Sequence, residues 1–132
     1  MHRSRFSNLV IDCLDAHFET SVAFWAEAFG APKPPKIRAG QRYVTLKTCP
    51  GGPEVLLQKV ERDPGVHLDF ETDSVVKESA RLEAAGGHRK YRVKTWQVME
   101  DPSGTPFCVI SKQHPKELER MLPWPDSTAR DT

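Results

Sequence analysis

The same order of elements occurs twice in the sequence, and this restricts the fold more than any other feature. Residues 25–30 (WAEAFG) parallel residues 81–86 (RLEAAG), and residues 10–13 (VIDC) parallel residues 67–70 (HLDF) at nearly the same offset. A short repeat of this kind cannot bury its apolar face alone and does so against its copy. The repeat therefore predicts two related modules.

The first copy begins with a strand over residues 8–14, followed by a helix over residues 17–29. Gly30 and the prolines after it end that helix. Two strands follow at residues 43–47 and 55–60, and the Pro-Gly-Gly-Pro sequence between them predicts a hairpin. One stripe of the helix is apolar and is expected in the core: Phe18, Val22, Trp25 and Phe29.

The second copy starts with a strand over residues 66–70 and a helix from Asp73 or Ser74 to about Ala85. Glu78 and Glu83 are expected on the solvent side of this helix. Its packing side is expected to hold Val75, Val76, Ala80 and Leu82. Three further strands are predicted at residues 91–93, 95–99 and 107–111, with a turn at residues 101–104.

We expect one domain over residues 1–112, with module one at about 7–60 and module two at about 65–112. Residues 113–132 form a C-terminal tail. The spacing of Leu118, Met121, Leu122 and Trp124 predicts a short amphipathic helix there, ended by Pro125, that packs on the domain or on a partner subunit.

Composition narrows the class of protein. The 132 residues are 38% hydrophobic and 28% charged, with a formal net charge of +1. Such a balance gives no overall field to attract nucleic acid or an anionic membrane. The three cysteines show no metal-motif spacing. With no signal peptide and no apolar run long enough for a bilayer, the sequence favours a cytoplasmic protein with reduced thiols.

Four segments occur in a distinctive order: Val10–Cys13 with Phe24–Gly30, Leu56–Gln58, His67–Phe70, and Asp101–Cys108 with its D-P-S-G turn. Together they resemble the vicinal oxygen chelate superfamily, which includes glyoxalases, bleomycin-resistance proteins and extradiol dioxygenases, in its glyoxalase-like branch. The resemblance covers roughly residues 8–112.

The resemblance implies an α+β fold of two β-α-β-β-β modules whose mixed sheet curls into an open cup. In metal-using members, the first and last strand of each module supply the ligands of a divalent ion. The matching positions here are Val10, Gln58, His67 and Cys108. Valine has no ligand atom and cysteine replaces a carboxylate, so we expect no competent metal site.

Strand alternation adds candidates independently of the family. His67 and Asp69 share one face of their strand, while Leu68 and Phe70 face the other way, toward the second helix. Trp96 is a candidate aromatic wall for a pocket. The ligand-binding residues expected in the cup are Asp12, Gln58, His67, Asp69, Trp96 and Cys108.

Alternatives remain for each candidate. His67 is either a ligand-binding residue or a histidine with a structural hydrogen bond. A Zn²⁺ ion accepts His, Cys and carboxylate ligands, so Asp12 could replace Val10 in a shifted site. Cys108 is either a nucleophile or a small core residue. Two basic clusters lie at residues 33–42 and 88–94. They form either a positively charged rim that receives an anionic small molecule or solvated faces of the hairpins.

We therefore predict a glyoxalase-like protein that binds a small molecule without a metal cofactor, as in relatives that sequester antibiotics. The alternative is a lyase, isomerase or dioxygenase that uses Zn, Ni, Mn or Fe at Gln58, His67 and Cys108. A third alternative is an interaction module that has lost its site. The catalytic residues are unknown, with His67 and Cys108 as candidates, and the family resemblance implies a homodimer.

Overall fold

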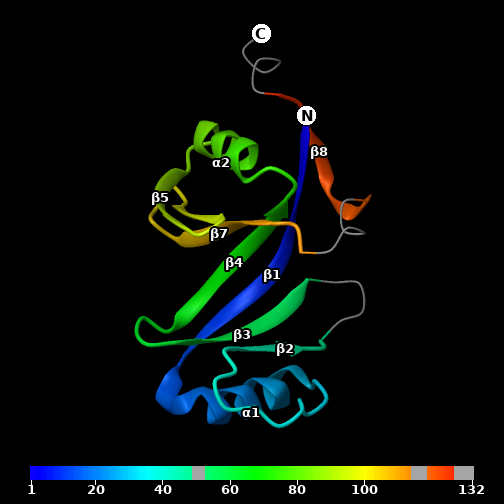
Figure 1. The fold of residues 1–132 in the computed structure, drawn as a ribbon, viewed down its shortest axis with the longest axis vertical. Helices are drawn as coiled ribbons and strands as arrows, with labels where there is room; N and C mark the ends of the chain where they lie inside the picture. Colours follow the sequence, from blue (N-terminus) through cyan, green and yellow to red (C-terminus); the bar gives the residue numbers. More distant parts are fainter. Residues whose placement is uncertain (49–52, 114–118, 127–132) are drawn as a thin grey trace. The chain divides into compact units, whose positions relative to one another are not determined.

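The computed structural model describes residues 1–48, 53–113 and 119–126. The chain divides into two compact units: unit 1 comprises Met1–Ser7 and Leu68–Thr132, and unit 2 comprises Asn8–His67. Strands β1 (His2–Leu14) and β4 (Gly65–Thr72) each contribute residues to both units. Figure 1 shows the elements with the labels used below.

Unit 2 combines part of β1 with a hairpin and one helix. The short 3-10 helix η1 (Asp15–His17) leads into α1 (Phe18–Phe29). Strand β2 (Tyr43–Leu46) pairs antiparallel with β3 (Glu54–Val60), which confirms the predicted hairpin. Strand β3 also pairs parallel with residues 8–14 of β1.

The core of unit 2 lies between α1 and one face of these strands. Burying side chains such as Phe18 and Leu57 stabilises the unit by about 2–3 kcal/mol each. Trp25 is partly buried against this core, but Phe29 is 39% exposed and so does not belong to it, contrary to our prediction. Phe29 lies in the last turn of α1, where its ring contacts Trp25 instead, at 5.9 Å between centroids. The buried residues are Ile11, Cys13, Phe18, Val22, Ala26, Val44, Leu46, Val55 and Leu57.

Unit 1 contains the other helix and the remaining strands. Helix α2 (Val75–Ala84) contacts β5 (His88–Val93), β6 (Trp96–Glu100) and β7 (Pro106–Ser111). Those strands pair antiparallel in sequence order, and β7 also pairs parallel with β4. The predicted cap of α2 is confirmed, because the Lys77 amide donates to the Ser74 hydroxyl at 3.2 Å.

The strands follow the hydrogen-bonded order β2-β3-β1-β4-β7-β6-β5, with β8 (Leu122–Trp124) on β1. This mixed sheet with two α-helices confirms the predicted α+β class. The second module has the order β4-α2-β5-β6-β7. In the first, two strands follow α1 within the described residues, because residues 31–42 contain three prolines and form no strand.

Glu78 contradicts our prediction of a solvent-facing side chain, because it is fully buried. Its carboxylate accepts hydrogen bonds from Arg81 Nε at 2.7 Å, Arg81 Nη2 at 2.8 Å and His2 Nε2 at 2.8 Å. The sequence prediction began the first strand at residue 8, so it left out His2. Val76 was predicted to pack, yet it is 63% exposed.

The tail also differs from our prediction. Leu122–Trp124 form strand β8, antiparallel to His2–Ser4, rather than a helix. Pro123 has no N–H to donate within a helix, which disfavours one here. The Trp124 indole donates to the Ser4 hydroxyl at 2.8 Å, and the Arg81 guanidinium stacks on the indole ring at 3.7 Å. Leu118 lies outside the described residues.

Candidate functional site

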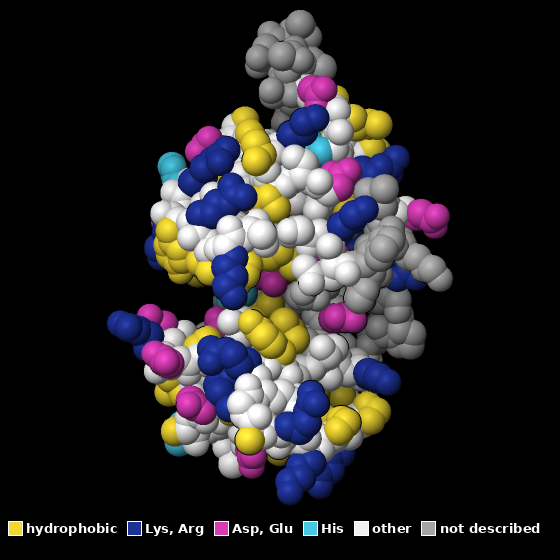
Figure 2. All heavy atoms as spheres, viewed as in Figure 1, with side chains coloured by type: hydrophobic (Ala, Val, Ile, Leu, Met, Phe, Trp, Pro, Cys, Tyr) yellow, Lys and Arg dark blue, Asp and Glu magenta, His cyan; other side chains and the backbone are white. Residues whose placement is uncertain are grey.

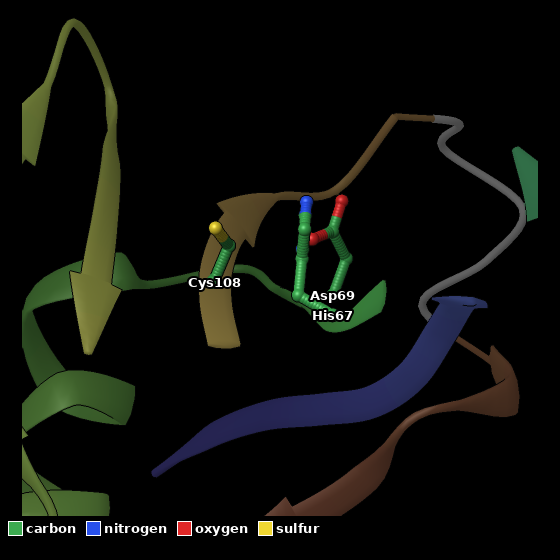
Figure 3. A group of neighbouring side chains, drawn as sticks. All are labelled: His67, Asp69 and Cys108. Carbon is green, nitrogen blue, oxygen red and sulfur yellow. The ribbon is translucent and has the colours of Figure 1, made fainter. Parts of the chain in front are cut away.

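Three predicted site residues lie together on β4 and its neighbour β7. His67 and Asp69 are two positions apart on β4, and Cys108 on β7 is the register partner of Asp69. Their ligand atoms all lie within 4.8 Å of one another. Figure 3 shows the three side chains pointing to the same side of the ribbon. Imidazole, carboxylate and thiol therefore converge.

A second part of the predicted set lies in unit 2. His67 Nε2 lies 3.2 Å from Asp12 Oδ2, and both side chains are 17% exposed. Gln58 is the register partner of Asp12 on the adjacent parallel strand. Val10, the residue at the family's first ligand position, is fully buried beside Leu56. Asp12 is thus the polar group of β1 that reaches His67.

Unit 2 also contains a hollow of about 400 Å³. It lies where the end of β1, the start of α1 and the residues that lead into β4 come together. Asp12 lines it, and therefore belongs to both the hollow and the pair with His67. The lining residues are Ile11, Asp12, Cys13, Leu14, His17, Ser21, Trp25, Pro64, Gly65 and Val66.

Sequence reasoning did not find most of this lining. His17, Ser21 and Trp25 recur every four residues, a spacing that places side chains on one face of a helix. This stripe was the sequence pattern that could have indicated the hollow. Only Trp25 was interpreted, and it was assigned to the core. The residues that close the hollow beside it, Pro64 to Val66, carry no sequence pattern of their own.

The Cys13 thiol in this lining is not activated. Burial raises its pKa above the ordinary value, and a hydrogen bond with Ser21 only partly offsets this. The negative charge of Asp12 raises the pKa further. Cys13 Sγ donates to the Ile11 carbonyl at 3.6 Å. A protonated thiol is a poor nucleophile, so Cys13 acts here as a packing residue.

The other face of β4 carries aromatic side chains. Phe70 contacts Phe6 and Phe107, each at 5.9 Å between ring centroids. Leu68 is 38% exposed, so the prediction that it packs under the second helix was wrong. Leu68 lies near the start of β4, whereas Thr72 at its other end is buried. Burial on this face therefore increases along the strand.

Trp96 lies at the start of β6 and is half-buried. It is two residues before Val98, whose register partner is Cys108. Alternation therefore places Trp96 on the same face of the sheet as Cys108. The basic residues of β5 are partly neutralised, since Arg89 lies 3.3 Å from Glu83 and Lys90 lies 3.7 Å from Glu100.

Among the described residues, every helix is too short or too polar to cross a membrane.

The mixed sheet with its two α-helices is consistent with the vicinal oxygen chelate fold. The family of glyoxalase-like domains matches residues 8–110, and the chain belongs to this family. The comparison with curated proteins found no match.

Solved structures share the fold. Methylmalonyl-CoA epimerase from Mycobacterium tuberculosis is 17% identical with a TM-score of 0.56, covering 84% of this chain and 89% of that one. A variant of the Streptomyces coelicolor epimerase in complex with 2-nitronate-propionyl-CoA is 17% identical, TM-score 0.52, covering 83% and 98%. An NAD-dependent benzaldehyde dehydrogenase from Legionella pneumophila is 10% identical, TM-score 0.58, covering 80% and 98%. At such identities the likeness shows the fold alone.

Proposed function

We propose that this protein binds a small molecule in the hollow of unit 2. The observation that carries the proposal is the hollow itself, about 400 Å³ with Asp12 and His17 in an otherwise largely apolar lining. Small-molecule sites typically measure about 300–1,000 Å³ and combine apolar walls with a few polar groups. The solved variant of the S. coelicolor epimerase, which is in complex with 2-nitronate-propionyl-CoA, supports ligand binding by this fold.

The lining defines the ligand class. Trp25, Leu14 and Val66 supply an apolar wall for a hydrocarbon or aromatic body. The Asp12 carboxylate accepts hydrogen bonds, so the ligand carries a donor such as an ammonium, amide or hydroxyl group. His67, at 3.2 Å, holds Asp12 in place. The ligand is therefore an amphipathic molecule with a polar donor at one end.

A fragment screen by thermal shift tests this proposal, because any ligand that binds only the folded state raises the melting temperature. Hits are then mapped by NMR on the intact chain. We expect Ser21→Phe to abolish binding by filling the hollow. We expect Asp12→Asn to reduce the affinity for donor-bearing ligands about tenfold, or 1.4 kcal/mol. Ala23→Phe is the matched control, since Ala23 is exposed and outside the lining. Hits that Ser21→Phe leaves unchanged would place the site elsewhere.

A second candidate function is metal-dependent catalysis, favoured by the convergence of His67, Asp69 and Cys108. Nitrogen, oxygen and sulfur donors suit Zn²⁺, and three protein ligands with a fourth open position are typical of catalytic zinc. Asp12 beside His67 resembles the carboxylates that orient ligating histidines. The residues thus fit a zinc ion, which would act as a Lewis acid on a substrate oxygen.

Calorimetric titration with Zn²⁺, Ni²⁺, Mn²⁺ and Fe²⁺ separates the two functions. If the second holds, one ion binds per chain, and Cys108→Ser reduces its affinity about 10- to 100-fold while Cys13→Ser does not. Equal affinity in both variants would exclude this site. Ligand binding in the hollow is unaffected by Cys108→Ser under the first function, so each proposal can fail separately.

We also propose a homodimer in a reducing cytoplasm. The family resemblance supports the dimer, and the free thiols of Cys13 and Cys108 support the reducing compartment. Sedimentation equilibrium of the intact chain tests the first point. A monomer at concentrations of about 100 μM would exclude a stable dimer.

A further inference from the structure

The segment after α1 has a restricted backbone. Residues 31–38 (APKPPKIR) contain neither helix nor strand. Proline fixes its own φ near about −65°, and a residue before proline is confined to extended conformations. Ala31, Lys33 and Pro34 each precede a proline. Residues 31–35, which form neither helix nor strand, therefore favour the extended polyproline II conformation.

The burial of this segment has the period of a polyproline II helix. Ala31, Pro34 and Ile37 are half-buried, at intervals of three residues, which is one turn of that helix. Ala31 and Ile37 pack against the core of unit 2. One side of the helix thus lies on the protein while two sides face solvent. The exposed residues are Pro32, Lys33, Pro35, Lys36 and Arg38.

Hydrogen bonds hold both ends of the segment. The Ala31 amide donates to the Ala26 carbonyl at 2.9 Å, beyond the end of α1. At the other end, the Arg38 amide donates to Gln41 Oε1 at 2.9 Å, and the Gln41 amide donates to the Arg38 carbonyl at 3.0 Å. The conformation of the exposed sides is therefore fixed before a partner binds, which lowers the conformational entropy lost on binding.

The exposed sides combine prolines with cations. Pro32 and Pro35 are one turn apart, and so are Lys33 and Lys36, at about 9 Å along the axis. Within the described part of unit 2, the ion pairs join Lys59 to Asp15 and His67 to Asp12, and none involves these lysines. Figure 2 shows Lys and Arg side chains (dark blue) among hydrophobic ones (yellow) over the region of α1 and its following segment.

We propose that this polyproline ridge (residues 31–38) docks into a protein groove lined by aromatic side chains and edged by carboxylates. Proline-rich helices of this conformation bind such grooves in SH3, WW and EVH1 domains, because the conformation is formed before binding. Aromatic rings pack on Pro32 and Pro35, and carboxylates pair with Lys33 and Lys36. The inference concerns a surface that the proposed ligand site does not use.

NMR titration of the intact ¹⁵N-labelled chain with purified SH3, WW and EVH1 domains tests the proposal. We expect shift changes in residues 30–42 with at least one domain whose groove is edged by carboxylates. The double variant Pro32→Ala, Pro35→Ala should weaken this binding at least about tenfold. The double variant Lys33→Glu, Lys36→Glu should do the same without affecting the fold, because both side chains are exposed.

Pro53→Ala with Lys47→Glu is the matched control, since both residues are exposed and lie outside the ridge. Shift changes confined to residues outside 30–42 would overturn the proposal. So would the absence of any shift change at about 1 mM domain, where even a Kd of about 1 mM is detectable. The same variants are also tested for binding to vesicles of anionic lipid. Binding that depends on the ridge and occurs with vesicles but with none of the protein domains would also overturn the proposal.

Discussion

The two helices of this protein cover their strands by different means. Helix α1 buries an apolar face formed by Phe18, Val22 and Ala26, and a hollow remains beside its first turn. Helix α2 instead buries Glu78 and Ser79. Two repeats of one pattern have thus diverged into an apolar layer with room for a ligand and a layer held by charged hydrogen bonds.

The difference lies in what surrounds each helix. In unit 1, His2 of β1 and Arg81 of α2 both contact Glu78, and Trp124 of β8 stacks on Arg81. These side chains exclude water from a carboxylate that would otherwise be solvated. A buried charge is tolerated only when it is paired and hydrogen-bonded, so the network depends on each member.

The largest effect is expected from Glu78→Ala. Removing this carboxylate leaves the Arg81 guanidinium partly buried without its bidentate partner, which typically costs about 3–5 kcal/mol. Urea unfolding followed by circular dichroism measures the free energy of unfolding. Glu83→Ala is the control, because Glu83 is 51% exposed and should change stability by less than about 0.5 kcal/mol. Equal effects of the two would show that the network is not stabilising.

Trp124→Ala should have the next largest effect, about 2–3 kcal/mol. The variant loses the stacking on Arg81, the hydrogen bond to Ser4 and apolar contact of a half-buried ring. Trp124→Phe keeps the ring but removes the indole N–H, and should recover more than half of the loss. If the phenylalanine variant is as unstable as the alanine variant, the hydrogen bond rather than the stacking holds β8.

A smaller, pH-dependent effect should come from the same carboxylate. Burial alone would raise the pKa of Glu78, but hydrogen bonds from Arg81, Ser4 and His2 outweigh it and lower the pKa below 4.5. The stability that this group contributes is therefore fully present above pH 4.5 and is lost as the pH falls through the lower folded-state pKa. The stability difference between the protein and Glu78→Gln should shrink between about pH 5 and pH 2. A difference that stays constant over this range would contradict the lowered pKa.

The smallest effect concerns Cys13 at the hollow. Because burial raises its pKa, alkylation by iodoacetamide at pH 7 should be at least about tenfold slower in the folded protein than in urea. Mass spectrometry of the Cys13 peptide measures this rate. A bound ligand should slow it further. Fast alkylation in the folded state would mean that the Cys13 thiol is more accessible to solvent than its burial in the structure indicates.

Local patterns predicted much of the fold. The apolar stripe and Gly30 located α1, Ser74 located the start of α2, and strand alternation placed His67 and Asp69 on one face. Each of these depends on residues close in sequence or on a strand period of two, which a single sequence displays directly. Cys108 entered the candidate site only through the family resemblance, and the structure places it beside Asp69.

Features that depend on distant residues were not predicted. Helical spacing predicted that Glu78 faces solvent, but its carboxylate is buried against partners that include His2, 76 residues away in sequence. Strand β8 forms because β1 offers a partner at His2–Ser4, whereas the local apolar spacing had predicted a helix. The hollow was missed because its lining is contributed by three separate segments.

Strand β4 has a consequence for any attempt to dissect the protein. The boundary between the units falls at His67–Leu68, inside a continuous strand, and the other boundary at Ser7–Asn8 falls inside β1. Neither boundary is a linker. Cutting the chain at either position would divide a strand next to residues that pair with other strands, so we expect neither unit to fold when expressed without the other.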